Sequence, residues 1–350
     1  MRRLGPILLL LLIPAPAVAR ETRTVHVRLL ERWGLQEAGF RESDHGPYRA
    51  IAARSGYLVE GGRPGASLRF GESTGTWWIR FQGRERQYPG VVTARASGDR
   101  LVLDDEVPLE DYVASVVTSE LPADWPMESL KAQAVLARTL AVKGGDHPDG
   151  SLCDLTHCQV FSGDRSAQGR QVALATRGLI LTYGGLPVTG LYHSTCAGAR
   201  ASNQAIFGGR AVSYLQGGPD PFCQASPHAR PWRAIVSRAE LAAALGVPSV
   251  EAIVLLDRTP GGWVTRLSVD GQRMTGYRFW QAIGRHLGWG ELKSLRFMVR
   301  REGDRFVFTG IGLGHGVGLC QWGARGRAIA GRDYRRVLAA YFPGTQLKAI

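Results

Sequence analysis

The sequence lacks an apolar run long enough to cross a bilayer as a helix. The apolar stretch from Ile7 to Ile13 follows Arg2 and Arg3 and precedes the small residues of 17–19. A basic start, a short apolar stretch and a small-residue end are typical of a cleaved export signal. We therefore expect residues 1–19 to be removed and the mature chain to be exported without a membrane span, an uncleaved anchor being the alternative.

Acidic residues are few relative to basic ones. The sequence has 30 Asp and Glu against 43 Lys and Arg, which gives a formal net charge of +13 at pH 7. Such a surplus favours contact with polyanions, although it can serve solubility alone. Because an exported chain does not meet nucleic acid, we expect anionic wall polymers or lipid headgroups as partners and no nucleic acid.

Cysteine is scarce and its count is odd. With five cysteines, at least one thiol of an exported chain stays unpaired if the others form disulfides. His147, Cys153 and Cys158 have the spacing H-x5-C-x4-C, with His157 adjacent, and a water or a fourth side chain would complete a tetrahedral zinc site. The disulfide alternative has two bridges and one free thiol: Cys153 with Cys158, Cys196 with Cys223, and Cys320 alone.

Two common catalytic signatures are also missing. The glycine-rich stretch at 310–318 lacks the Gly-Lys-Ser/Thr ending of a phosphate-binding loop, and no H-E-x-x-H pair is present, which disfavours a zinc hydrolase. Glycine recurs at every second position of this stretch. An extended chain here would present one face without side chains, open to close approach by a sugar or another strand, with His315 on the opposite face.

The remaining pattern predicts an α+β fold, in which a helical segment packs with β-hairpins and meanders beside an N-terminal β-rich lobe at 20–104. The lobe has short alternating runs separated by Gly-rich turns, at 25–29, 48–53, 68–70, 77–81 and 101–104. In the middle of the chain we expect a helix at 167–175 and a hairpin of 179–183 with 186–192. A helix at 237–246 with a Ser237/Glu240 capping box should follow, then a meander with turns at 261–262 and 270–271. The last expected elements are a helix from Thr275, a strand at 306–308 and two closing helices.

Residues 107–143 carry the clearest helical pattern. Apolar residues recur at helical spacing from Leu109 to Val117, and Pro122 and Pro126 separate this helix from a second one that ends at 144–145. The break between the two helices is a place where a side chain can face a ligand instead of a core.

Three charged residues of this segment stand out. Glu120 lies at the break, and Lys131 and Arg138 share one face of the second helix, two turns apart. On spacing alone, a solvated carboxylate and a solvated basic face are the ordinary explanation.

The sequence resembles the SpoIID/LytB family of bacterial cell-wall proteins. The resemblance lies in YVASVVTSELPADWPMESLKAQAVLARTLA (112–141), CDLTHCQVFSG (153–163), LYHSTCAG (191–198), GIGLGHGVGLCQWGA (310–324) and YFPGT (341–345). These stretches follow the family's order, and they imply a domain over 105–345, with a catalytic helical part at 105–205 and a second half at 206–345.

The resemblance implies a peptidoglycan lytic transglycosylase of the periplasm or cell wall that acts on glycan strands. It places Glu120 at the catalytic glutamate and Lys131 and Arg138 at basic positions needed for activity. Some members are instead amidase enhancers, so a wall-binding protein that stimulates a cell-wall amidase is the alternative. No cofactor is implied as required, and the spacing of His147, Cys153 and Cys158 resembles a zinc site seen in some members.

Lytic transglycosylation works with one carboxyl. The acid protonates the glycosidic oxygen, and its carboxylate then takes the proton of the sugar's own C6 hydroxyl, whereas a hydrolase usually needs a second carboxylate. Such an acid must be protonated at working pH, which requires a raised pKa. The side chains expected to contact the substrate beside Glu120 are His193, Ser194, His315, Gln321 and, toward a muramyl carboxylate, Lys131 and Arg138.

Overall fold

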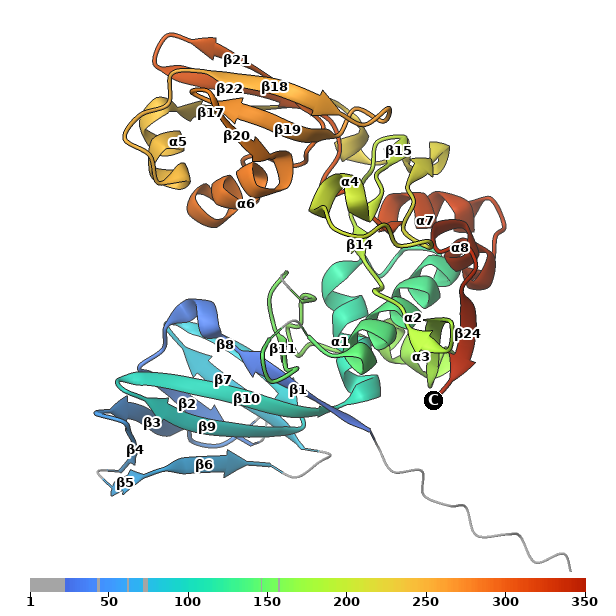
Figure 1. Cartoon of the computed structure of the whole chain (residues 1–350). Helices are drawn as coiled ribbons and strands as arrows, with labels where there is room; N and C mark the ends of the chain where they lie inside the picture. The colour runs from blue at the N-terminus through green and yellow to red at the C-terminus, as the bar shows by residue number, and fades with distance from the viewer. Residues whose placement is uncertain (1–22, 43–44, 62, 72–74, 146, 157) are drawn as a thin grey trace, which may run out of the picture.

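The computed structural model describes residues 23–350 except 43–44, 62, 72–74, 146 and 157 (Figure 1). The expected export signal at 1–19 and the position of His157 lie outside the described residues. Within the described ranges, no helix is both long and apolar enough to span a bilayer. Eight α-helices and several separate sheets are described, so the α+β prediction is confirmed.

Two sheets form the N-terminal lobe. One orders β11 (Leu152–Cys153), β1 (Thr24–Leu29), β10 (Arg100–Pro108), β9 (Val91–Ser97) and β6 (Ser67–Phe70). The other orders β5 (Arg63–Gly65), β4 (Tyr57–Glu60), β3 (Arg49–Arg54), β2 (Glu37–Arg41), β7 (Thr76–Phe81) and β8 (Arg84–Pro89). Burial alternates along β1 and β10 because successive strand residues face opposite sides. The inward set forms a core in which Phe40 stacks on Phe70 at 4.4 Å between ring centroids, and the β-rich prediction for this region is confirmed.

The helical segment follows this lobe directly. β10 runs into α1 (Leu109–Glu120), which is followed by α2 (Met127–Lys143) and α3 (Ala167–Ala175). The apolar stripe predicted for α1 is buried as expected, and Pro108 and Pro126 stand at the two N-termini, where a missing N–H costs nothing. The same hydrophobic core continues from the strands into α1 and the adjacent face of α2.

Short strands join the middle of the chain to its end. β12 (Leu179–Tyr183) pairs with β13 (Leu186–Pro187) on one side and with β24 (Gln346–Ala349) on the other. The predicted hairpin is too long: its second arm ends as a strand at Pro187, and the last bond to β12 runs from the Val188 N–H to the Leu181 carbonyl at 3.0 Å. Tyr192 belongs instead to β14 (Tyr192–His193), which pairs in parallel with β23 (Leu319–Cys320). The other short elements here are β15 (Ala199–Arg200), α4 (Asn203–Phe207), β16 (Gly218–Pro219) and the 3-10 turns η1 (Glu31–Trp33), η2 (Pro221–Cys223) and η3 (Pro227–Ala229).

A separate α/β module lies at the opposite end of the molecule from the N-terminal lobe (Figure 1). Its sheets are β17 (Trp232–Ser237), β22 (Arg305–Gly310) and β21 (Phe297–Glu302), and the predicted meander β18 (Ile253–Arg258), β19 (Val264–Val269) and β20 (Gln272–Thr275). α5 (Arg238–Leu245) has the predicted capping box, and α6 (Gly276–Leu287) begins after Thr275 as expected. α7 (Gln321–Ile329) and α8 (Tyr334–Tyr341) return to α2, and β24, not a helix, ends the chain.

The glycine-rich stretch is not the extended strand that the sequence suggested. Gly312, Gly314, Gly316 and Gly318 have φ of 88°, 98°, 81° and 75°, which side-chain-bearing residues rarely adopt. A Cβ on Gly316 would lie 2.3 Å from the Trp263 ring, and one on Gly318 would lie 2.1 Å from the Leu191 carbonyl oxygen. The glycines therefore permit close packing within the protein.

Candidate functional site

Glu120 is the last residue of α1. The N–H of Leu121 still bonds the Val117 carbonyl at 3.1 Å, but Leu121 itself is extended, so the helix stops there. Pro122 and Pro126 bracket the turn into α2. A carboxyl at this position faces the negative end of the helix dipole, which disfavours its charged form.

Three hydrogen-bond donors from distant segments meet the Glu120 carboxyl. Val160 N–H and Tyr192 O–H each donate to Oε1 at 3.0 Å. The Nε2–H of Gln321 approaches Oε2 at 3.4 Å, which places Gln321 beside Glu120, while its expected contact with the substrate stays a prediction. Burial raises the pKa of Glu120 above its ordinary value, and the three donors offset this only in part. No cation of the described residues is among the groups that shift this pKa.

The two carboxyl oxygens of Glu120 are not equivalent. Oε1 accepts two hydrogen bonds of ordinary length, whereas Oε2 has one long contact. A proton on the carboxyl is therefore best placed on Oε2, because Oε1 is already saturated by donors. The protonated acid presents an O–H that the protein itself does not fully use.

Tyr192, Val160 and Gln159 are site residues that the sequence analysis missed. Burial and the nearby Glu120 carboxyl raise the pKa of Tyr192 well above its usual range, so its phenol stays a donor. Its hydroxyl also lies 3.3 Å from Oε1 of Gln159, whose amide donates to Tyr112 and to the backbone. The only sequence signal for these residues was their position. Tyr192 immediately precedes His193 and Gln159 immediately follows Cys158, in two of the stretches that resemble the family.

An aromatic pair packs α7 against the turn after Glu120. Trp125 and Trp322 meet edge to face at 5.1 Å, and the Arg325 guanidinium lies 5.2 Å from the Trp322 ring. The backbone N–H of Trp322 donates to the Ser194 carbonyl at 3.1 Å. These contacts hold the first turn of α7, and with it Gln321, beside the carboxyl.

The two histidines expected at the substrate are bound to backbone instead. His315 lies 3.0 Å from the Tyr192 carbonyl through Nε2, and its Nδ1 accepts the N–H of Val317 at 3.1 Å. Burial lowers the pKa of His315 to about 4 and that of His193 well below its usual range, so both rings are neutral near pH 7. The Ser194 hydroxyl pairs with Thr195 at 3.3 Å. These three side chains support the loop that carries Tyr192, and their predicted substrate contacts stay untested.

Arg138 does not share a ligand-facing surface with Lys131. Its side chain is 0% exposed and makes a two-point ion pair with Glu110 at 2.6 and 3.0 Å, and it also donates to the carbonyls of Ala173 and Leu179. This burial contradicts the prediction that Arg138 faces the substrate, because α3 and β12 cover that part of α2. The Lys131 ammonium is partly exposed and pairs with Glu128 at 2.7 Å.

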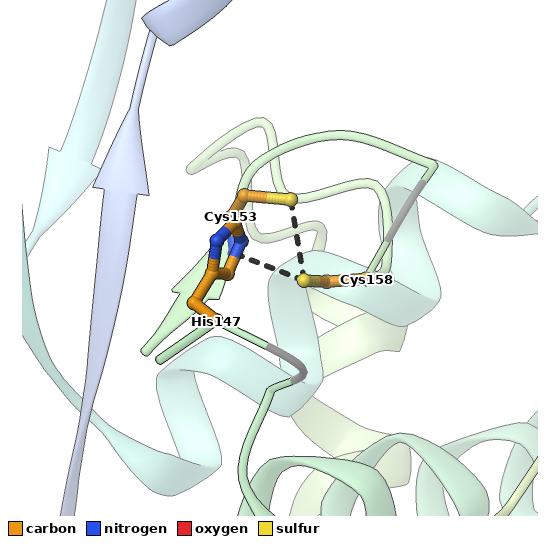
Figure 2. A group of neighbouring side chains, drawn as sticks. All are labelled: His147, Cys153 and Cys158. Atoms are coloured by element: carbon orange, nitrogen blue, oxygen red, sulfur yellow. Dashed lines mark hydrogen bonds between the residues drawn. The ribbon is translucent and has the colours of Figure 1, made fainter. Parts of the chain in front are cut away.

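His147, Cys153 and Cys158 converge as the spacing predicted. Their side chains point toward one another (Figure 2), and one donor atom from each lies within 4.8 Å of the others. The two Sγ atoms are 3.2 Å apart, and the N–H of Cys153 points at the Cys158 sulfur at 3.2 Å. Two thiols and an imidazole fit three positions of a tetrahedral zinc site. Cys158 precedes Val160 by two residues, so this cluster lies next to one of the donors to Glu120.

Comparison with known proteins places Glu120 and Val160, but not Tyr192 or Gln321, within a matched segment. The family model described as Stage II sporulation protein matches residues 97–183, and a domain of unknown function (DUF8618) matches residues 233–318, which cover most of the module of β17 to β22. An uncharacterized protein of Brachyspira hyodysenteriae is 32% identical over 75% of this chain and 72% of its own length. Stage II sporulation protein D of Bacillus subtilis is 30% identical over 69% and 75%. An amidase enhancer of the same organism is 24% identical over 66% of this chain and 39% of its own length.

Proposed function

Because the chain belongs to the SpoIID family, we propose that it is an exported cell-wall protein that cleaves peptidoglycan glycan strands as a lytic transglycosylase, with Glu120 as general acid and base. The observation that carries this proposal is the Glu120 carboxyl, which is buried at a helix end with a raised pKa and one oxygen left with a single long contact. A raised pKa keeps a larger fraction of the carboxyl protonated at a given pH, and protonation of a glycosidic oxygen requires this form.

The residues around Glu120 support both halves of that reaction. The Oε2–H protonates the glycosidic oxygen as the bond to the anomeric carbon breaks, which leaves a carboxylate and an oxocarbenium-like sugar. Val160 N–H and Tyr192 O–H, already bonded to Oε1, stabilise the new negative charge. The carboxylate then takes the proton of the C6 hydroxyl while that oxygen bonds the anomeric carbon. The acid is restored, and the product carries a 1,6-anhydro ring.

Carboxylates near Glu120 in the sequence are either exposed or paired with other groups. Asp124 is exposed on the turn, Glu128 binds Lys131 and the backbone N–H of Tyr334, and Asp111 pairs with Arg165 at 2.7 Å. This arrangement favours a mechanism with one carboxyl over hydrolysis with two.

Incubation of the protein with purified glycan strands tests the proposal. Mass spectrometry should detect new muramyl ends that are smaller by one water than hydrolytic ends, as the anhydro ring requires. Hydrolytic ends alone would contradict the transglycosylase mechanism, and no new ends at all would contradict cleavage.

Stimulation of a cell-wall amidase is the second function that a specific observation favours. It comes from the similarity to the Bacillus subtilis amidase enhancer, of whose length this chain covers 39%. If the protein acts by stimulating an amidase, a Glu120→Gln variant should stimulate a purified amidase as well as the unaltered protein does. Glycan binding without new ends in the digest would agree with it.

Replacing Tyr192 by Phe should slow cleavage and change its pH dependence. Because the raised pKa keeps the acid protonated, activity is present below the Glu120 pKa and is lost as pH rises through it. The Tyr192 bond stabilises the carboxylate, so its loss raises that pKa further and moves the alkaline limb to higher pH. The rate should fall about tenfold or more, since a hydrogen bond to a charged group contributes about 1.5–3 kcal/mol.

Initial rates over a pH series measure this effect, and Tyr183→Phe is the matched control, because Tyr183 is 43% exposed on β12. If the alkaline limb of the pH–rate profile is unchanged in Tyr192→Phe, or moves to lower pH, the Tyr192 hydroxyl does not stabilise the Glu120 carboxylate.

We also propose that His147, Cys153 and Cys158 hold a structural zinc, which would supply a fixed anchor for the segment that carries Val160. The Cys158→Ser variant should then contain about one zinc less per chain than the unaltered protein and should melt at a lower temperature. Metal analysis of chains purified without chelator measures the difference. A Cys153–Cys158 disulfide in the purified protein, found by peptide mapping, would contradict the zinc.

A further inference from the structure

A second group of sulfur and nitrogen atoms lies outside the site described above. His193 ends β14 and Cys196 lies three residues after it, Cys223 ends η2, and Cys320 ends β23. These segments are distant in sequence, yet all four side chains are buried, with the three cysteines 0% exposed and His193 4%. Thiols and an imidazole that meet in a buried position are the ligand set of structural zinc.

Three of the four side chains have mutually close ligand atoms, and the fourth, Cys223, is close to one of them. The Sγ atoms of Cys196 and Cys223 are 3.6 Å apart. A ring nitrogen of His193 and the Sγ atoms of Cys196 and Cys320 all lie within 4.8 Å of one another. Two sulfurs on one tetrahedral zinc, each about 2.3 Å from the metal, are about 3.8 Å apart.

We propose that His193, Cys196, Cys223 and Cys320 bind one structural Zn²⁺ through three thiolates and a neutral imidazole. Binding releases the three thiol protons to solvent and forms three Zn–S bonds and one Zn–N bond, so the four-coordinate site has a net charge of −1. This site is separate from the cluster of His147, Cys153 and Cys158, and it does not depend on the proposed cleavage reaction.

Backbone donors are already directed at two of the sulfurs. Gly198 N–H lies 3.2 Å from the Cys223 sulfur. Cys320 Sγ receives two N–H groups, from Cys196 at 3.3 Å and from Gly323 at 3.4 Å. Such donors stabilise a thiolate more than a neutral thiol, because hydrogen bonds to a charged acceptor are the stronger ones. The surrounding backbone therefore stabilises the thiolate form of Cys223 and Cys320.

The His193 ring is in the protonation state that a metal needs. Its Nδ1 lies 3.1 Å from the Val317 carbonyl, which can only accept, so Nδ1 carries the hydrogen. Nε2 therefore has the free lone pair, and it is buried without a hydrogen-bond partner among the described residues. A backbone carbonyl that fixes the tautomer of a histidine is the usual outer contact of a zinc ligand.

Neighbouring charges compensate the site. The Arg296 guanidinium donates to the carbonyls of Cys196 and Ala197 at 2.7 and 2.8 Å, so its positive charge lies beside the thiolates. Asp220 lies 3.7 Å from the Cys196 sulfur, but its charge is paired with Arg327 at 3.3 Å. A disulfide between Cys196 and Cys223 would use only two of the three buried thiols and would leave Nε2 of His193 without a partner.

A metal at this site would fix the positions of β14 and β23, which carry or precede two of the donors to Glu120. Tyr192 precedes His193 on β14 and Gln321 follows Cys320 at the start of α7, and both donate to the Glu120 carboxyl. The proposed ion thus joins β14 and β23 to η2 behind the donors.

Metal content of a double variant tests the proposal without interference from the other cluster. The full chain with Cys153→Ser and Cys158→Ser, purified without chelator, should contain about one zinc per chain, and adding Cys320→Ser should reduce this to a small fraction. Cobalt substituted for zinc should give a sulfur-to-metal absorption band that weakens when Cys223→Ser is introduced. A metal-free double variant would overturn the site.

Alkylation of the unaltered protein provides a second measurement that needs no variant. After denaturation with chelator but without reductant, Cys196, Cys223 and Cys320 should all react with iodoacetamide. Labelling of Cys320 alone, with Cys196 and Cys223 recovered as one disulfide-linked peptide, would overturn the proposal.

Discussion

The Glu120→Gln variant is expected to release no anhydro-muramyl ends at a measurable rate while still binding glycan strands. Glutamine keeps the size of the side chain and can still meet the Val160 and Tyr192 donors, but it has no proton to give to the glycosidic oxygen. General acid catalysis contributes about 10²- to 10⁴-fold, so the rate should fall by at least that factor. Mass spectrometry of digested strands and a pull-down with the same strands measure the two properties.

Asp124→Asn is the matched control for this variant. It makes the same chemical change four residues later, on an exposed part of the turn, and should leave product release unchanged. Equal product release by Glu120→Gln and by the unaltered protein would exclude Glu120 from the reaction. Equal loss of strand binding in both variants would indicate that strand binding depends on the negative charge of the turn and not on Glu120 as an acid.

The same variant has a defined effect on stability. Burial raises the folded-state pKa of Glu120, so the carboxyl stabilises the fold at a pH below its ordinary pKa, and this contribution is lost as pH rises through the raised value. Glutamine does not ionise. Glu120→Gln should therefore be more stable than the unaltered protein at neutral pH, and the difference should shrink at acidic pH, as denaturant titrations at the two pH values would show.

Arg138→Ala should produce the largest loss of stability of any single change considered. The substitution leaves the Glu110 carboxylate without its cationic partner and removes the hydrogen bonds to the Ala173 and Leu179 carbonyls. Breaking a buried ion pair from one side costs about 3–5 kcal/mol, and the lower end applies because Glu110 keeps 28% side-chain exposure. Thermal and denaturant unfolding measure the effect.

Lys131→Ala is the control for Arg138→Ala, since both remove one cation from α2. The Lys131 side chain is 23% exposed, so the loss of its pair with Glu128 should cost about 1 kcal/mol or less. Equal destabilisation by the two variants would contradict the buried role of Arg138. A rise in KM for glycan strands in folded Arg138→Ala, with stability unchanged, would restore the original prediction that it binds substrate.

Local pattern was sufficient for the helices on either side of Glu120 and for the position of Glu120 between them. The spacing of apolar residues from Leu109 to Val117 and the prolines at 122 and 126 act within a few residues, so the two helices and the break between them could be predicted. The spacing of His147, Cys153 and Cys158 is equally local, and it correctly brought the three side chains together.

Contacts between distant segments could not be predicted in the same way. Tyr192 and Gln321 reach Glu120 across 72 and 201 residues, and no periodicity connects positions so far apart. The burial of Arg138 depends on which face of α2 is covered, and its helical spacing from Lys131 carries no information about that. The glycines of 310–318 share a spacing of two with a strand, but their positive φ values follow from what packs against them.

For this protein, the amino-acid order alone specified an α+β chain with one carboxyl at a helix break and a nearby pair of thiols with an imidazole. The environment of these residues was decided only by the tertiary structure. Burial raises the pKa of Glu120, donors from two remote segments bind one of its oxygens, and Arg138 becomes a buried partner of Glu110. Helix formation depends on neighbours along the chain, whereas desolvation and charge balance depend on neighbours in space.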